Sequence, residues 1–142
     1  MRYLFLAALL AAAMLCAPAL AQQKVKIATS LGDIVIELDA AKTPKSADNF
    51  VQYVKAGHYD GTIFHRVIED FMIQGGGMKP DMKEKTTRAP IPLESRSGLA
   101  NTRGTVSMAR ASNPDSGDSQ FFICFDDATF LDNQYTAWGN VI

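Results

Sequence analysis

The stretch FHRVIEDFMIQGG, residues 64–76, decides the fold of this chain. Its first apolar run carries a cation, Arg66, and ends in an acidic turn. The second apolar run carries an aromatic side chain, a thioether and an amide, at Phe71, Met72 and Gln74. Two short apolar runs joined by a turn predict two neighbouring β-strands.

Short strands of this kind recur along the chain. The pattern predicts strands over residues 24–29, 34–38, 62–67, 71–74, 105–110, 120–125 and 136–142. A turn at Ser30–Asp33 makes the first two strands a hairpin, and Ile68–Asp70 connects the next two. After Gly75–Gly77, the long polar segment Met78–Asn101 is a predicted surface excursion. Many short strands with glycine-rich breaks predict an all-β domain, either an antiparallel barrel or a sandwich.

One early segment has helical spacing instead. Thr43 is the predicted cap, Pro44 takes the first helical position, and Gly57 ends the helix. The apolar residues that recur at helical spacing are Ala47, Phe50, Val51 and Val54. We expect this apolar face to cover an open end of the sheet.

The first 21 residues have the organisation of a secretory signal peptide. Arg2 gives a positive start, Leu4–Leu15 is apolar, and Ala19–Ala21 has the small-x-small form that signal peptidase cuts. A transmembrane anchor is the weaker interpretation, because the apolar run is short for about 30 Å of hydrocarbon. A lipid on Cys16 is also weaker, because Leu15 is a poor small-residue position.

Cleavage after residue 21 would leave one domain, residues 22–142, in the periplasm. Without Arg2, the chain keeps 13 of its 14 basic residues and all 15 acidic ones, which gives a net charge of −2. This near-neutral balance argues against nucleic acid or an anionic membrane as the main partner. Cys124 would then be the only cysteine, with no partner for an intrachain disulfide. Its apolar neighbours predict a buried, unreactive thiol.

Two further stretches follow residues 64–76, GTVSMA at 104–109 and SQFFIC at 119–124. In this order the three stretches resemble the cyclophilin family of peptidyl-prolyl cis/trans isomerases, and the resemblance runs from about Lys24 to the last residue. It implies a closed, eight-stranded antiparallel barrel capped by helices. Cyclophilins continue past the position of Val141 with a helix and a final strand, so the resemblance also implies a domain that lacks both.

The activity that the resemblance implies is rotation about X–Pro bonds, with no metal, cofactor or covalent intermediate. Amide resonance sets a barrier of about 18–20 kcal/mol. A donor to the prolyl nitrogen weakens this resonance while an apolar socket grips the ring. The implied partners are proline-containing unfolded or flexible polypeptides, such as exported proteins during folding. The protein is expected to be a monomer with no membrane partner after cleavage. The alternative is a non-catalytic cyclophilin-like module that binds proline-containing segments as a chaperone or adaptor.

The family motif assigns the site residues. Arg66 is the predicted donor to the prolyl nitrogen, and Gln74 is predicted to brace it; these two are the predicted catalytic residues. The predicted substrate-binding residues, which form the proline socket and its groove, are Phe71, Met72, Ala109, Arg110, Gln120, Phe122, Phe130, Leu131 and Tyr135. Phe130 stands where tryptophan is frequent in eukaryotic members of the family, so the resemblance implies loss of an indole hydrogen bond and weak cyclosporin binding. Tyr135 stands where histidine is frequent, and both changes keep an aromatic wall.

Other assignments of the polar residues are weaker. Asp118, Ser119 and His65 could be taken for a hydrolase triad, but no nucleophile-elbow pattern surrounds Ser119. His65 is predicted to be structural, because adjacent residues of a strand point to opposite faces and Arg66 is assigned to the site. His58 and His65 lack the spacing of metal ligands.

Overall fold

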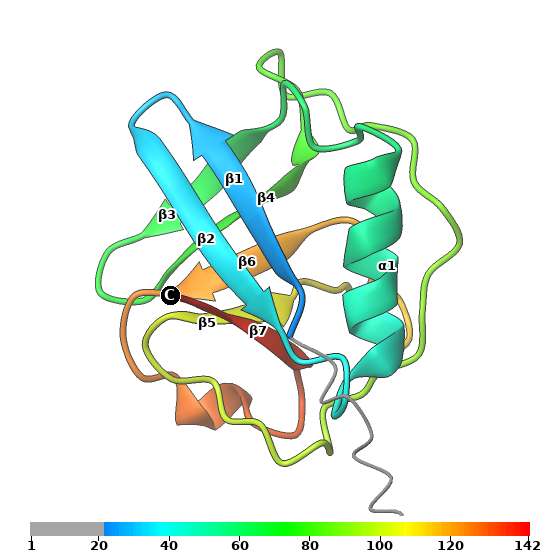
Figure 1. Ribbon diagram of the computed structural model, residues 1–142, viewed down its shortest axis with the longest axis vertical. Helices are drawn as coiled ribbons and strands as arrows, with labels where there is room; N and C mark the ends of the chain where they lie inside the picture. The colour runs from blue at the N-terminus through cyan, green and yellow to red at the C-terminus, as the bar shows by residue number, and fades with distance from the viewer. Residues whose placement is uncertain (1–21) are drawn as a thin grey trace, which may run out of the picture.

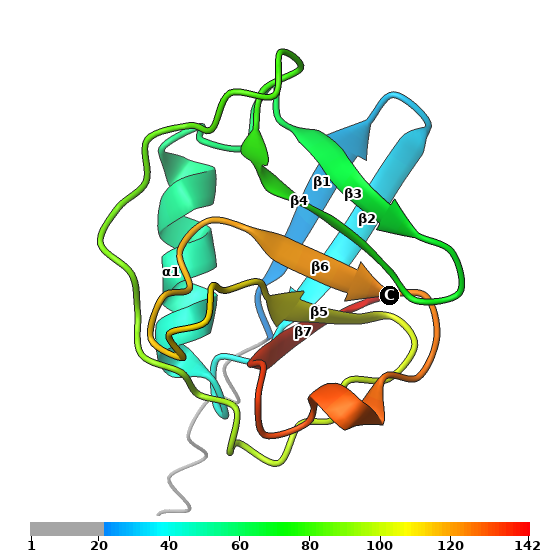
Figure 2. The same ribbon diagram turned by 180° about the vertical axis from the view of Figure 1, so that it is seen from behind.

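The computed structural model describes residues 22–142. Within this range one antiparallel sheet of seven strands has the order β1-β2-β7-β5-β6-β4-β3. The strands are β1 Lys24–Thr29, β2 Gly32–Leu38, β3 Ile63–Ile68, β4 Met72–Met78, β5 Thr105–Met108, β6 Phe121–Cys124 and β7 Ala137–Val141. The sheet is curled: β1 and β2 pass in front of β3 and β4 in Figure 1 and behind them in Figure 2. The predicted all-β class is confirmed, as a curled half-barrel of seven strands.

In the described residues two helical elements accompany the sheet, α1 Pro44–Lys55 and the short 3-10 helix η1 Thr129–Leu131. The last three strands are each shorter than predicted, by one or two residues at one or both ends. The predicted leader, residues 1–21, lies outside the described residues. In residues 22–142 no helix is long and apolar enough to cross a membrane.

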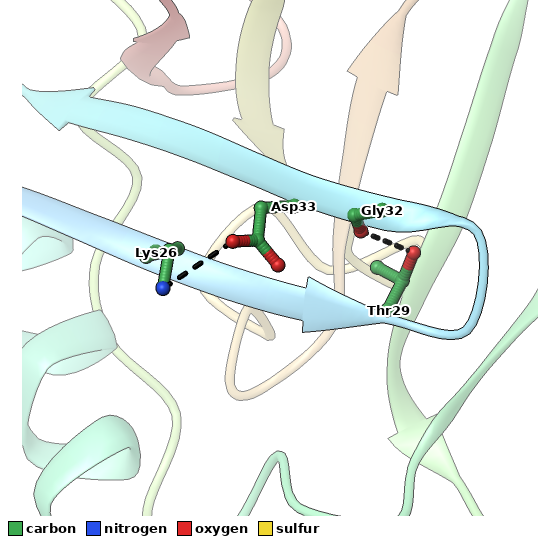
Figure 3. Close-up of polar contacts among 4 residues, drawn as sticks. All are labelled: Lys26, Thr29, Gly32 and Asp33. Atoms are coloured by element: carbon green, nitrogen blue, oxygen red, sulfur yellow. Dashed lines mark hydrogen bonds and ion pairs between the residues drawn. The ribbon is translucent and has the colours of Figure 1, made fainter.

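The β1–β2 hairpin is tighter than the turn predicted at Ser30–Asp33. Thr29 and Gly32 are already paired across the two strands, so the loop has only two residues. The Thr29 hydroxyl donates to the Gly32 carbonyl at 2.6 Å (Figure 3). Gly32 has a φ of 129°, which a residue with a side chain rarely adopts. The ion pair between Lys26 and Asp33, at 3.3 Å, is solvent-exposed and therefore adds little stability.

The main core lies between α1 and the inner face of the curled sheet (Figure 1). Its buried members are Ile36, Leu38, Ala47, Phe50, Val51, Val106, Met108, Phe121, Ile123 and Trp138. Phe50 of α1 lies 4.6 Å from Trp138 and 5.8 Å from Phe121, measured between ring centroids. The apolar face of the helix thus packs on the sheet, as the sequence predicts, and the contact is largely aromatic.

One predicted member of the helical face was wrong. Val54 is 37% exposed, whereas Tyr53, which was not assigned to that face, is 2% exposed. The Tyr53 ring packs against His58 at 4.7 Å, and its hydroxyl accepts a hydrogen bond from the Arg88 main-chain N–H. Burial of Tyr53 is favourable because its polar end has this partner, which is supplied from far along the chain.

The glycine run was also assigned wrongly, because β4 continues through Gly75–Gly77 to Met78. These glycines allow neighbouring side chains to lie directly on the strand. A Cβ on Gly75 would come within 2.8 Å of the Phe64 ring, and a Cβ on Gly77 within 2.6 Å of Gln120. The run is therefore a place of close approach between strands rather than the end of one.

The excursion after β4 is fixed to the rest of the fold through Glu94. Its Oε1 accepts hydrogen bonds from the main-chain N–H of Ser46 at 2.7 Å and from the Ser46 hydroxyl at 2.8 Å. Its Oε2 accepts from the Lys45 N–H at 3.3 Å. The predicted cap, Thr43, instead donates its hydroxyl to the Asp39 carbonyl. A carboxylate far along the chain therefore caps α1.

Candidate active site

A second apolar cluster lies on the outer face of the sheet. Its buried members are Met72, Phe122, Cys124 and Ala128, and Ile68, Phe71, Ala109, Leu131 and Tyr135 pack against them. Phe121 and Ile123 belong to the main core, whereas Phe122 and Cys124 belong to this outer cluster. Successive residues of β6 thus face opposite sides of the sheet. Six of the predicted substrate-binding residues meet in the outer cluster.

The outer cluster has a buried floor and an aromatic rim. Met72 and Phe122, from the adjacent strands β4 and β6, are 3% and 5% exposed. Tyr135 meets Phe122 edge to face, with ring centroids 5.8 Å apart. Phe130 lies 5.5 Å from Phe71 and is 67% exposed. Aromatic side chains therefore flank the floor at the surface, an arrangement suited to gripping a small apolar ring.

A chain of polar side chains borders the outer cluster. Arg66 of β3 and Gln74 of β4 are cross-strand partners, and the Arg66 Nη1 donates to the Gln74 Oε1 at 3.3 Å. The Gln74 Nε2 in turn donates to the Gln120 Oε1 at 3.0 Å. Gln74 is paired with Phe122 across β4 and β6, so this series of hydrogen-bonded side chains lies beside the apolar floor. Gln74 thus makes the hydrogen bond to Arg66 that the predicted brace requires.

A bulge in β3 directs Arg66 to the outer face. Phe64 pairs with Gly75 and Arg66 with Gln74, so His65 is an extra residue in the strand. In a regular strand Phe64 and Arg66 would share a face. Here Phe64 packs against the main core, whereas Arg66 hydrogen-bonds with Gln74 outside it. Bulges of this kind frequently re-aim side chains at sites. The His65 Nδ1 is buried and has no hydrogen-bond partner within residues 22–142.

Hydrogen bonds to the buried Asn101 hold the segment that carries Phe130 and Leu131. Asp132, which follows η1, accepts hydrogen bonds from the Asn101 main-chain N–H at 2.7 Å and from its side-chain Nδ2 at 3.0 Å. The Asn101 Oδ1 accepts a hydrogen bond from the Ser107 hydroxyl. Both Asn101 and Ser107 are fully buried. This network fixes the end of η1 to β5.

Cys124 contributes an apolar surface to the outer cluster. Its side chain is buried, and this burial raises the pKa of the thiol to about 11. The thiol is therefore protonated at neutral pH and unsuited to nucleophilic chemistry. In the part of the chain that the structure describes, no group of three or more His, Cys, Asp or Glu side chains could hold a metal ion.

Sequence reasoning missed some members of the outer cluster. Ile68 was assigned to the connection between strands, but it is the last residue of β3 and packs against the outer cluster. Its position two residues after Arg66 could have shown that both share the outer face. No sequence pattern assigned Ala128 to the outer cluster, because a small loop residue joins such a cluster only through contacts that form in the folded protein.

Comparison with known proteins agrees with this fold. The family described as "Cyclophilin type peptidyl-prolyl cis-trans isomerase/CLD" matches residues 24–142. The chain is 56% identical to a peptidyl-prolyl cis-trans isomerase of Acinetobacter baylyi, over 91% of this chain and 71% of that protein. It is 49% identical to peptidyl-prolyl cis-trans isomerase B of Escherichia coli, over 78% and 70% of the two lengths.

Among solved structures, a cyclophilin type isomerase of Cryptosporidium parvum, crystallised in the presence of the dipeptide Ala-Pro, superposes with a TM-score of 0.73. That match is 34% identical and covers 84% of this chain and 78% of the other. The chain belongs to the cyclophilin family. It is a peptidyl-prolyl cis/trans isomerase.

Proposed function

We propose that the outer cluster is the proline socket of this isomerase and that Arg66 acts on the bond that rotates. The observation that carries the proposal is the chain from Arg66 through Gln74 to Gln120, which borders an apolar floor. The Gln74 amide holds one Nη1 donor of Arg66, and the rest of the fork is available to a peptide. A donor directed at the prolyl nitrogen removes its lone pair from amide resonance and so lowers the rotational barrier.

The floor and rim have a different task in this mechanism. Met72 and Phe122 exclude water beneath the proline ring, and Phe71, Leu131 and Tyr135 enclose it from the sides. A dry surrounding strengthens the hydrogen bond from Arg66, because little water competes for its donors. The substrates are proline-containing segments of unfolded or flexible chains; the relative crystallised with Ala-Pro supports this substrate class.

Replacement of Arg66 tests the mechanism. A charge-assisted hydrogen bond contributes about 1.5–3 kcal/mol, so Arg66→Ala should lower the isomerisation rate roughly tenfold or more. Arg66→Lys should remain impaired, because an ammonium cannot contact Gln74 and the prolyl nitrogen as a planar fork does. The rate is measured by NMR exchange on a proline tetrapeptide. Arg96→Ala, which removes an exposed arginine outside the outer cluster, is the matched control. An Arg66→Ala protein with the activity of this control would refute the assignment.

We also propose that the protein is exported and assists the folding of exported proteins. Leu4–Leu15 followed by Ala19–Ala21 supports a leader that is cut after Ala21. Mass spectrometry of the protein from a periplasmic extract should show Gln22 as its first residue. Replacement of both Ala19 and Ala21 by bulky residues should block cleavage, whereas the same change at Ala11 and Ala12 should not. An intact Met1 in the unmodified protein, or a lipid on Cys16, would contradict the proposal.

A further inference from the structure

Arg110 makes an unusual set of contacts at the rim of the outer cluster. It follows β5, and its guanidinium carbon lies over the Tyr135 ring, 4.6 Å from the centroid. The two ion pairs found within residues 22–142 both belong to the β1–β2 hairpin, so Arg110 pairs with no described carboxylate. A guanidinium that lies over an aromatic ring is attracted by the negative face of the ring.

Main-chain carbonyls hold the Arg110 guanidinium in place. Its Nε donates to the Gln134 carbonyl at 2.9 Å. Its Nη1 donates to the Ala111 carbonyl at 2.9 Å and to the Ser112 carbonyl at 3.4 Å. These carbonyls belong to two segments, the loop after β5 and the segment after η1. The guanidinium therefore joins the two segments beside Tyr135.

Tyr135 also contacts the floor of the proposed socket. Its ring meets the buried Phe122 edge to face at 5.8 Å, and its main-chain N–H donates to the Leu131 carbonyl. The main chain of Tyr135 is thus fixed, but its half-buried ring can rotate outward unless something covers it. Arg110 is the group that covers it.

We propose that Arg110 is a positioning residue of the isomerase, whose guanidinium holds the ring of Tyr135 against Phe122 and so sets the side wall of the proline socket. This inference rests on the proposed function, because it needs Tyr135 to contact the substrate. Lysine cannot replace Arg110 here, because a compact ammonium lacks the planar surface over the ring, and its donors share one atom instead of forming the rigid fork that reaches the two segments from Nε and Nη1.

A double-mutant cycle tests the proposal with the cis/trans exchange of a proline tetrapeptide as the readout. Arg110→Met keeps an apolar stem over the ring but removes the charge and the donors. We expect it to lower kcat/KM about three- to tenfold, mainly through a higher KM, since a loosened wall weakens the grip on the ring before and during rotation. Arg110→Lys should recover little of this loss.

Combining Arg110→Met with variants of Tyr135 distinguishes a positioning role of Arg110 from a role that does not act through the ring. In Tyr135→Phe the ring remains, so Arg110→Met should cause the same loss as in the unmodified protein. In Tyr135→Ala there is no ring to hold, so Arg110→Met should cause no further loss. Arg88→Met is the matched control, because Arg88 also lies over a tyrosine, Tyr53, but outside the site; it should leave kcat/KM unchanged.

Three results would overturn the inference. The first is an unchanged kcat/KM in Arg110→Met. The second is an equal loss in the Tyr135→Ala background, which would mean that Arg110 acts without the ring. The third is a loss that matches the fraction of unfolded protein, followed by the fluorescence of the buried Trp138. If Tyr135→Ala alone keeps full activity, the proposed socket is wrong as well, so the two failures are distinguishable.

Discussion

Removal of the Glu94 carboxylate should leave the N-terminus of α1 without its cap and lower the stability of the protein. Glu94 receives hydrogen bonds from the Ser46 N–H, the Ser46 hydroxyl and, at greater length, the Lys45 N–H. Hydrogen bonds to a charged group contribute about 1.5–3 kcal/mol, and loss of a helix cap costs about 0.5–2 kcal/mol. Because these estimates describe the same contacts, they are not summed, and we expect Glu94→Ala to lower the free energy of unfolding by about 2 kcal/mol. For a domain of this length that corresponds to a fall in Tm of about 8 °C.

Trp138 provides the assay for this loss. It is the only tryptophan of the chain, it is buried, and it lies 4.6 Å from Phe50 of α1. Its fluorescence in urea therefore reports both unfolding of the core and undocking of the helix. Glu94→Gln keeps an acceptor for Ser46 but removes the charge, so its loss should be about half that of Glu94→Ala.

Glu69→Ala is the matched control for Glu94→Ala. Glu69 is exposed in the turn between β3 and β4, away from the helix, so its removal should leave the unfolding midpoint almost unchanged. The reasoning would be refuted if Glu94→Ala unfolds at the midpoint of this control. It would also fail if Glu94→Gln is as stable as the unmodified protein while Glu94→Ala is not, because the charge would then contribute nothing.

Three further predictions concern the outer cluster and its support. Asn101→Ala should lower the free energy of unfolding in urea by about 2–4 kcal/mol, since it leaves the buried Ser107 hydroxyl without a partner; a loss below about 0.5 kcal/mol would contradict the network. Cys124 should resist a disulfide reagent at pH 7 in the native protein and react at once in denaturant; rapid labelling of the native protein would disprove this. Because burial raises the thiol pKa to about 11, the stability that its protonated form contributes should be present below about pH 8.5 and be lost as the pH rises towards 11. Phe130→Trp should tighten cyclosporin binding roughly tenfold in a calorimetric titration, because the indole adds a donor and a larger ring; tight binding by the unmodified protein would contradict the reasoning.

Local patterns predicted much of this fold, because its strands are short apolar or alternating runs that turn and glycine-rich segments separate. The sequence assigns Phe122 to the site, and the alternation of a strand then directs its neighbour Phe121 to the other face; the structure has Phe121 in the main core and Phe122 in the outer cluster. The start of the helix at Pro44 was also predicted correctly, since proline at the first helical position needs no partner for a missing N–H.

Features that depend on distant parts of the chain could not be predicted locally. Tyr53 is buried because Arg88 supplies its hydrogen bond, and Glu94 caps the helix from outside it. Gly75 lies within β4 at a point where Phe64 of the preceding strand, β3, occupies the space that a Cβ would need. In each case the deciding contact joins residues of different elements, so local propensity does not predict it.

The site residues were assigned from a motif, and the curled sheet explains why periodicity alone could not assign them. The bulge at His65 reverses the inside–outside alternation between Phe64 and Arg66, so a regular strand pattern would assign these two side chains to one face. Beyond the bulge, β4 and β6 each have a neighbouring strand on both sides, whereas β1 ends the sheet order at the opposite end. The floor of the proposed socket thus lies on strands whose inner faces pack in the main core. We therefore expect a substitution at Ile73 or Ile123 to affect the proposed socket through the same strands that carry Met72 and Phe122.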